Sequence, residues 1–146
     1  ILPSMIPVRQ TLFVDTHPKR RGNCMSACIA SILEFPIDKV IDTTSDEVRS
    51  SGCWQQGIEN WLEENHEMKM MLVSPSSSKL EGVYSIGCGP SPRGDFYHAV
   101  VCKNGVMVFD PHPSDDGCKS FKYYYIIFNK NFNWPFGDKN DEKASG

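Results

Sequence analysis

The sequence contains no long apolar run. None of its hydrophobic stretches approaches the roughly 20 residues that a membrane-spanning helix needs, and its beginning lacks the charged-then-apolar pattern of a secretory signal peptide. It also lacks an excess of positive charge, because 15 Lys and Arg stand against 18 Asp and Glu, for a formal net charge of -3. That balance argues against a general nucleic-acid binder. We therefore expect a cytoplasmic protein that binds neither membranes nor nucleic acid.

The sequence has no Cys-x2-Cys pair, the spacing from which zinc knuckles are commonly built. Its 146 residues include six cysteines. Without a secretory signal in a chain of this length, we interpret them as reduced thiols rather than as three disulfides. We expect no cofactor. The cysteines are Cys24, Cys28, Cys53, Cys88, Cys102 and Cys118.

The length and composition are those of one domain, which we assign to residues 5–136. Met5 is followed by a plausible native start, so residues 1–4 are interpreted as a non-native remnant. Residues 137–146 are polar without apolar periodicity, and we expect a flexible tail. There is no internal repeat.

The hydrophobic pattern changes period along the chain. Apolar residues recur at helical spacing after Cys24, and again from Trp54 to a predicted helix end near His66. Short β-like runs bounded by Pro, Gly, Ser or Asn follow. The sequence therefore predicts an α+β fold with a mostly antiparallel sheet. The runs are Met70–Val73, Val83–Ile86, Tyr97–Cys102, Val106–Phe109 and Phe121–Phe128.

Two segments precede the first predicted helix. Val8–Val14 alternates loosely, which fits either a short strand or an extended arm. Asp15–Gly22 contains Gly and Pro breakers, and we predict a loop. Its three adjacent cations, Lys19–Arg21, are interpreted as a solvated turn.

Cys24 is predicted to lie on the first turn of a helix. Asn23 is a good N-cap, and Pro36 stops the helix after Phe35. A thiol at this position feels the positive end of the helix dipole, which favours the thiolate and prepares a nucleophile. The alternative is that Cys24 is a small buried residue that packs like a hydrophobe.

A hairpin is predicted around Lys103-Asn104-Gly105. A two-residue loop would pair Ala99 with Asp110 and send this carboxylate to the opposite face from His98. A three-residue loop, or a bulge with the same result, would place both side chains on one face, with Cβ atoms about 5 Å apart in a direct pair. We predict the second arrangement, because a carboxylate could then orient the imidazole for proton exchange with Cys24.

Each of these residues also has an ordinary structural explanation. His98 could be a half-buried strand histidine, and Asp110 could be the turn residue of Asp110-Pro111-His112-Pro113. A cysteine at a helix start, a histidine on a strand and an aspartate on its hairpin partner nevertheless form a specified geometry. We therefore predict a Cys24-His98-Asp110 triad.

Three blocks of the chain resemble C39-like peptidases of the papain-like superfamily. They are Asn23–Leu33, His98–Val101 and Asp110-Pro111. The resemblance implies a papain-like fold, with a central N-terminal helix packed on an antiparallel sheet, and acyl transfer through a thioester. It assigns Cys24 as nucleophile, His98 as general base and acid, and Asp110 as the residue that orients His98.

One position departs from the family pattern. Papain-like enzymes usually place a glutamine a few residues before the cysteine to complete the oxyanion hole, whereas this chain has Pro18–Arg21 there. Gln10 is the nearest upstream glutamine, and the loop between them could bring it back to Cys24. Asn23 is the other candidate, although we expect capping to occupy its side chain.

The expected substrate is a peptide, a protein or an amide-bearing small molecule. Gly87–Gly94 leads into the predicted His98 strand, and its glycines allow close backbone approach. Arg93 is a candidate ligand for a substrate carboxylate or phosphate, or else a solvated loop residue. His112 either lines the cleft or sits in a Pro-rich turn. Peptidase, amidase, deamidase and transferase chemistry all remain open.

Two readings from other classes compete with a thiol hydrolase. Cys24 and Cys28 lie one helical turn apart and, with His98 and His112, could form a zinc site. The chain could also be a catalytically silent papain-like module that binds a peptide in its cleft. Metal analysis tests the first alternative and thiol reactivity tests the second.

Overall fold

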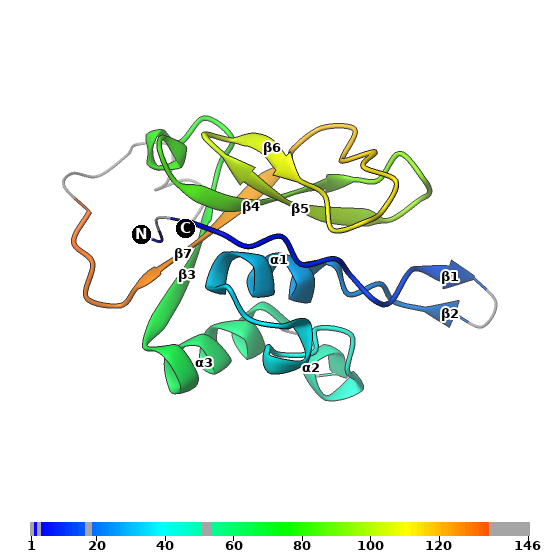
Figure 1. The fold of residues 1–146 in the computed structure, drawn as a ribbon, viewed down its shortest axis with the longest axis horizontal. Coiled ribbons are helices and arrows are strands. Elements are labelled where there is room, and N and C mark those ends of the chain that lie inside the picture. Colours follow the sequence, from blue (N-terminus) through cyan, green and yellow to red (C-terminus); the bar gives the residue numbers. More distant parts are fainter. Residues whose placement is uncertain (1, 3, 17–18, 51–53, 135–146) are drawn as a thin grey trace.

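In the computed structural model, which describes residues 2, 4–16, 19–50 and 54–134, the helices come first and the main sheet follows (Figure 1). The predicted tail, residues 137–146, lies outside the described residues. So do Cys53 and residues 1 and 3 of the predicted remnant. The segment expected to be a loop contains two short paired strands, β1 (Asp15–Thr16) and β2 (Lys19–Arg20).

Helix α1 (Cys24–Leu33) begins at Cys24 as predicted but ends earlier than Pro36 alone would require. Glu34 adopts the left-handed conformation at φ 62°, and the Phe35 N–H donates to the Ala30 carbonyl at 2.9 Å. These features close the last turn in the way that C-terminal caps do. Two residues therefore separate the end of α1 at Leu33 from the proline.

Three shorter elements and one long helix complete the helical part. They are η1 (Ile37–Lys39), α2 (Asp46–Ser50), η2 (Ser78–Leu80) and α3 (Trp54–His66). Helix α3 confirms the predicted amphipathic helix and its end at His66. Its apolar stripe directs Ile58 and Leu62 into the core, because side chains four apart share one face of a helix.

The five strands that follow form one antiparallel sheet, which confirms the α+β class. Their order is β3-β7-β4-β5-β6, so β7 lies between β3 and β4. The strands are β3 (Met68–Val73), β4 (Tyr84–Pro90), β5 (Tyr97–Lys103), β6 (Val106–Phe109) and β7 (Tyr123–Asn129).

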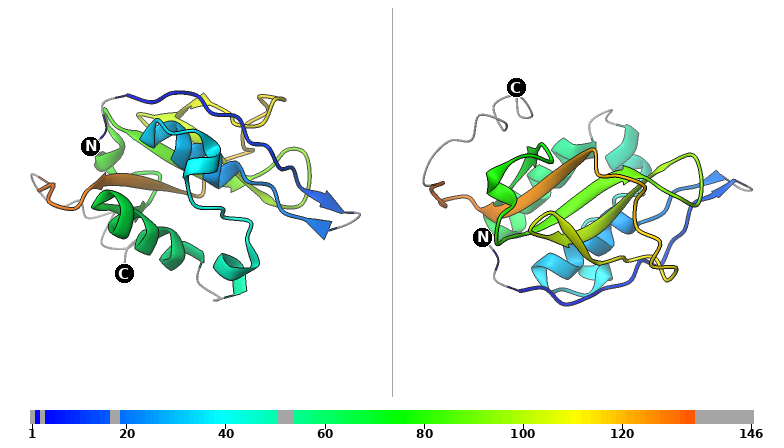
Figure 2. Two further views of the ribbon diagram at one scale, coloured as in Figure 1. Left: turned by 60° about the horizontal axis from the view of Figure 1, so that its bottom comes forward. Right: turned by 90° about the horizontal axis from the view of Figure 1, so that it is seen from above.

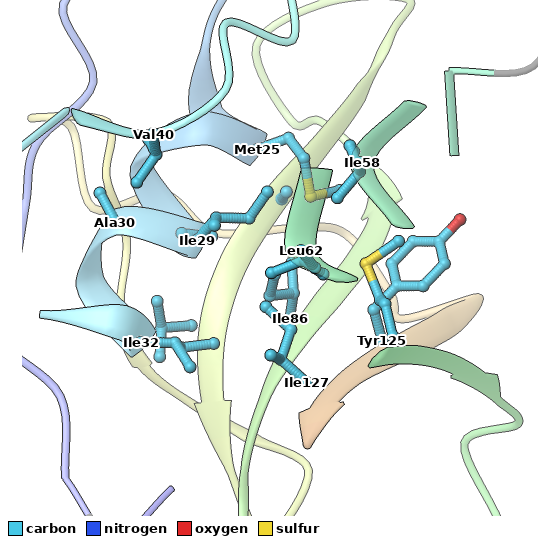
Figure 3. Close-up of a cluster of buried hydrophobic side chains, with 14 of the residues drawn as sticks. Met25, Ile29, Ala30, Ile32, Val40, Ile58, Leu62, Ile86, Tyr125 and Ile127 are labelled. Carbon is cyan, nitrogen blue, oxygen red and sulfur yellow. The ribbon is translucent and has the colours of Figure 1, made fainter. Parts of the chain in front are cut away.

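The main hydrophobic core lies between the helices and one face of this sheet. Figure 2 shows α1 and α3 on the same side of the strands, and Figure 3 shows how their side chains meet those of the sheet. The opposite face buries a second cluster that includes Val100 and Tyr124. Helix α1 packs on β4 and on β5, the strand that carries His98. The labelled core residues are Met25, Ile29, Ala30, Ile32, Val40, Ile58, Leu62, Ile86, Tyr125 and Ile127.

The segment that precedes β1 is an extended arm, which resolves the alternative left open by its sequence. Ile6 N–H donates to the Ser31 carbonyl at the end of α1, and Gln10 N–H donates to the Pro111 carbonyl after β6. At its far end, the Leu12 carbonyl accepts from the Asn23 N–H. The arm thus runs along α1 toward Cys24, between the helix and the loop that follows β6 (Figure 1).

Two glycines of β4 leave room for another segment of the chain to pack closely against the strand. A Cβ atom on Gly89 would lie 1.7 Å from the Ser120 carbonyl oxygen, and one on Gly87 would lie 2.8 Å from the Phe121 ring. The approaching segment is therefore the chain that enters β7. Since Gly89 pairs with His98 across β4 and β5, this packing lies beside His98, on the face of the sheet to which both residues point.

Candidate active site

Cys24 is the first residue of α1 and is half-buried. Its backbone N–H has no partner within the helix, because the first N–H groups of any α-helix lack one. The prediction that Asn23 caps this helix through its side chain is wrong. Asn23 makes no side-chain cap hydrogen bond, because its amide is turned toward the N-terminal arm.

The His98 side chain is paired with the Asp110 carboxylate. His98 Nε2 lies 2.7 Å from Asp110 Oδ1, and the two residues are 3% and 2% exposed. With Nε2 engaged in this way, Nδ1 is the ring nitrogen left for another group. Cys24 is near enough to His98 to help raise the pKa of its ring. The structure therefore brings the three predicted triad residues together.

The β5–β6 hairpin makes this pair through a bulge rather than through a longer loop. Asn104 (φ 54°) and Gly105 (φ 74°) form a two-residue turn that pairs Lys103 with Val106. The expected three-residue loop and direct pairing of His98 with Asp110 are thus wrong.

Between Val101 and Cys102 the register then shifts, so that Val101 lies opposite Phe109 and Val108 is the extra residue. One further step in the shifted register sets Asp110 opposite Val100. His98 lies two residues from Val100 on β5, so both side chains point to the same face of the sheet. The Asp110 side chain therefore points to that face as well. The bulge that the sequence left as an alternative is what makes the contact.

Asp110 is held as a carboxylate by several donors. The backbone N–H of His112 donates to Oδ1 at 2.9 Å and that of Gly117 donates to Oδ2 at 2.8 Å. Burial alone would raise the pKa of Asp110, but its hydrogen bonds with His98, His112 and Gly117 keep this pKa below its ordinary value of 3.8. Asp110 is therefore an anion that fixes the histidine ring.

His98 is more basic than an ordinary histidine. Burial lowers its pKa, yet the hydrogen bonds with Asp110 and Cys24, together with their charges, outweigh burial and raise the pKa from 6.5 to about 9. Below that pH the ring is an imidazolium between the Asp110 carboxylate and the Cys24 sulfur. Such a ring stabilises a thiolate and can later donate a proton.

A pocket of about 270 Å³ opens at Cys24. Four of the residues predicted to form the site line it: Cys24, His98, Gln10 and Arg93. Asp110 lies behind His98 and does not line the pocket. The arrangement provides a nucleophile, a proton carrier and further polar groups around one cavity, which acyl transfer requires.

Gln10 reaches the pocket because the arm returns to the start of α1. Its Nε2 donates to the Leu12 carbonyl at 2.9 Å and lies 3.4 Å from where a Cβ on Gly22 would be. An amide nitrogen carries two hydrogens, so one remains for another acceptor.

Asn23 holds the arm in this position rather than acting in the pocket. Its Oδ1 accepts the N–H groups of Thr11 and Leu12, each at 2.9 Å, and its Nδ2 donates to Thr11 Oγ1 at 2.9 Å. Asn23 is buried and does not line the pocket. The role of Asn23 in the oxyanion hole therefore stays a prediction, and its place outside the pocket lining does not favour it.

His112 also lies outside the pocket lining, although its ring centroid is 6.2 Å from that of His98. Its Nδ1 and the Ser114 hydroxyl are 2.8 Å apart, and its ring packs edge-on against Phe13. Burial, followed by the charge of Arg93, lowers the pKa of His112. His112 therefore belongs to the loop that supports Asp110. Of its two expected places, the cleft or the Pro-rich turn, the structure shows the turn.

The remaining described thiols are poorly suited to react. Burial raises the pKa of Cys102 and of Cys118 to about 12, and it raises those of Cys28 and Cys88 well above their ordinary value. Cys28 faces the hydrophobic core and is fully buried. The cysteines thus differ sharply in environment even though several are close together.

The zinc site considered from the sequence is not formed. Among the residues that the structure describes, no group of three or more His, Cys, Asp or Glu side chains could hold a metal ion. The helical spacing of Cys24 and Cys28 sends the second thiol into the core, while Cys24 stays at the pocket.

Sequence reasoning missed three arginines. Arg9 Nη1 donates to the carbonyls of Asp110 and His112, which ties the arm to the loop after β6. Arg21 and Arg49 line the pocket. Arg21 belongs to the cation run Lys19–Arg21 interpreted as a solvated turn, and this interpretation is incomplete because Arg21 lines the pocket. Nothing in the local sequence singles out Arg49.

Comparison of the chain with protein-family models, with curated proteins and with solved structures finds no match. None of the described helices is both long enough and apolar enough to cross a membrane.

We predict that His98 titrates near pH 9, because the two neighbouring groups stabilise its protonated form. Cys24→Ser and Asp110→Asn each remove one of these groups and are expected to lower the pKa of His98 toward or below 6.5. NMR titration of ¹³Cε1-labelled histidine measures this, with Asp38→Asn as a control at an exposed carboxylate. A wild-type His98 that titrates at 6.5, unchanged in Cys24→Ser, would contradict the coupling.

Proposed function

We propose that the protein is a cysteine-dependent hydrolase of the peptidase or amidase type. Cys24 is the nucleophile, His98 the general base and acid, and Asp110 the residue that orients His98. The observation that carries this proposal is the buried His98, which contacts Asp110 through Nε2 and lines one pocket together with Cys24.

The first half of the reaction forms a thioester. The Cys24 sulfur attacks the acyl carbon of the substrate, a C–S bond forms and the carbonyl oxygen takes up the negative charge. His98 then donates its proton to the leaving amine as the C–N bond breaks. The acyl group is left on Cys24, and His98 is left neutral.

The second half restores the enzyme. A water molecule loses a proton to His98 while its oxygen attacks the thioester carbon. The C–S bond then breaks, the carboxylic acid leaves and Cys24 returns as a thiolate beside a protonated His98. Asp110 keeps its charge throughout, because its role is to hold the ring and stabilise the imidazolium.

Gln10 and the start of α1 would stabilise the oxyanion. The Cys24 N–H has no partner within the helix, and Gln10 Nε2 has one hydrogen beyond that donated to Leu12. Donors fixed before the reaction are effective because they need no reorganisation when the negative charge develops. Asn23 and Arg9 are positioning residues, since they hold the arm that carries Gln10.

The resemblance to C39-like peptidases supports the same chemistry. Its cysteine block covers α1, its histidine block lies on β5, and its Asp-Pro block comes directly after β6. We extend the proposal to a papain-like fold with peptide, protein or amide-bearing substrates. A catalytically silent peptide-binding module is the competing outcome, and thiol reactivity distinguishes the two.

Below pH 7, iodoacetamide is expected to label Cys24 at least about 10-fold faster than Cys118, because only thiolates react and burial raises the pKa of Cys118. Cys118 is a matched comparison, since both residues are half-buried. His98→Ala should remove most of this advantage, whereas His66→Ala, outside the pocket, should not. Peptide mass spectrometry over time measures each rate. If Cys24 reacts as slowly as Cys118, the proposed hydrolase is contradicted and the catalytically silent peptide-binding module remains.

Gln10→Ala is expected to slow acylation of Cys24 by 4-nitrophenyl acetate by about 100-fold, the usual cost of one lost oxyanion donor. Gln10→Glu should also be slow, because a carboxylate replaces the donor with an acceptor. The rate of nitrophenolate release measures acylation, and Gln56→Ala on the exposed side of α3 is the control. Undiminished acylation in Gln10→Ala would remove Gln10 from the mechanism.

A further inference from the structure

The pocket at Cys24 gathers three arginines: Arg21, Arg49 and Arg93. Among the described residues that line it, none is Asp or Glu. The whole chain carries a net charge of -3, so this concentration of cations is local. Like charges placed together repel, and the arrangement gains stability when an anion joins them.

Arg49 is fixed in place by an uncharged acceptor and an aromatic ring. Its Nε donates to the Thr43 carbonyl at 2.8 Å, and its guanidinium lies over the Trp54 ring at 5.5 Å. Burial lowers the pKa of Arg49 and the charge of Arg21 lowers it further, whereas the Cys24 sulfur raises it. Arg49 therefore faces both another cation and the nucleophile.

Arg21 is only weakly compensated. Its Nη1 lies 3.5 Å from Asp46 Oδ1, in a pair whose carboxylate is fully exposed, and 3.3 Å from the Thr44 carbonyl. Exposed ion pairs of this kind contribute little, because water screens both charges. Most of the positive charge of Arg21 remains available to the pocket.

Arg93 carries the strongest indication of a missing acceptor. Its Nε and Nη2 atoms are shielded from solvent and have no hydrogen-bond partner among the described residues. These atoms lie on one edge of the planar guanidinium, and a carboxylate binds that edge through two parallel hydrogen bonds. Phe96 packs on the guanidinium at 5.9 Å and also lines the pocket.

We propose that this pocket binds a carboxylate of the substrate next to the acyl group that Cys24 attacks. Arg93 holds the carboxylate side-on after a small rotation into the pocket, and Arg49 and Arg21 add charge. This inference rests on the proposed function and names its substrate class. With a volume of about 270 Å³, the pocket suits one acidic side chain or one chain terminus rather than a long segment.

Iodoacetate and iodoacetamide test the charge preference, because they alkylate the same thiol and differ in a carboxylate. The ratio of their rates at Cys24 is expected to exceed that at Cys118 and at free 2-mercaptoethanol by about 10-fold, since hydrogen bonds between charged groups are the strong ones. Added salt should reduce the preference. Peptide mass spectrometry of the full chain gives the rates at both cysteines.

Variants identify the source of the preference. Arg93→Gln and Arg49→Gln should each lower the ratio at Cys24, whereas Lys69→Gln removes an equal charge outside the pocket and should leave it unchanged. A high ratio that survives both arginine substitutions would assign the preference to the charge of His98 and overturn the proposal. An equal ratio at Cys24 and Cys118 would also overturn it.

Esters locate the carboxylate relative to the bond that breaks. A glutaryl 4-nitrophenyl ester is compared with the pentanoyl ester, and the acetyl ester of 4-hydroxybenzoate with that of 4-hydroxybenzamide. Faster reaction of either charged ester supports the proposal and shows which side of the bond carries the charge. Fast reaction of the neutral esters alone overturns the inference but not the proposed function. No reaction of Cys24 with any ester or with iodoacetamide contradicts the proposed function itself.

Discussion

The buried hydrogen bond between His98 and Asp110 is the interaction on which the arrangement of the site depends. A carboxylate removed from water is costly unless donors surround it, and Asp110 obtains them from the His98 ring and from the loop that follows β6. The same loop accepts hydrogen bonds from Arg9 and Gln10 of the N-terminal arm. The same contact therefore fixes the histidine, closes the loop and anchors the arm that returns to Cys24.

The fold class and the order of its elements could be predicted from the sequence, because they depend on periodicity. The spacing of Ile58 and Leu62 defines α3, and the short runs bounded by breakers define the strands. The end of α1 was harder to predict from the sequence. A left-handed Glu34 closes the helix before Pro36, and the local sequence favours no such conformation at a glutamate.

The site was predictable in its residues and less so in its geometry. The sequence indicates Cys24, His98 and Asp110, but a bulge at Val108 rather than the loop length sets the contact between the last two. Gln10 reaches the pocket because Asn23 binds the arm, a contact between residues that no helical or strand periodicity relates. Arg49 lines the pocket through tertiary packing alone. Such long-range contacts leave no periodic signal in one sequence.

The central claim is that Cys24 carries a covalent acyl intermediate, and trapping that intermediate tests it most directly. The full chain is mixed with 4-nitrophenyl acetate, quenched in acid within the burst of nitrophenolate and digested for mass spectrometry. The account predicts one acetyl group on the Cys24 peptide, lost on hydroxylamine treatment as a thioester is, and little in His98→Ala. Acetylation spread over lysines or other cysteines, with Cys24 unmodified, would contradict it.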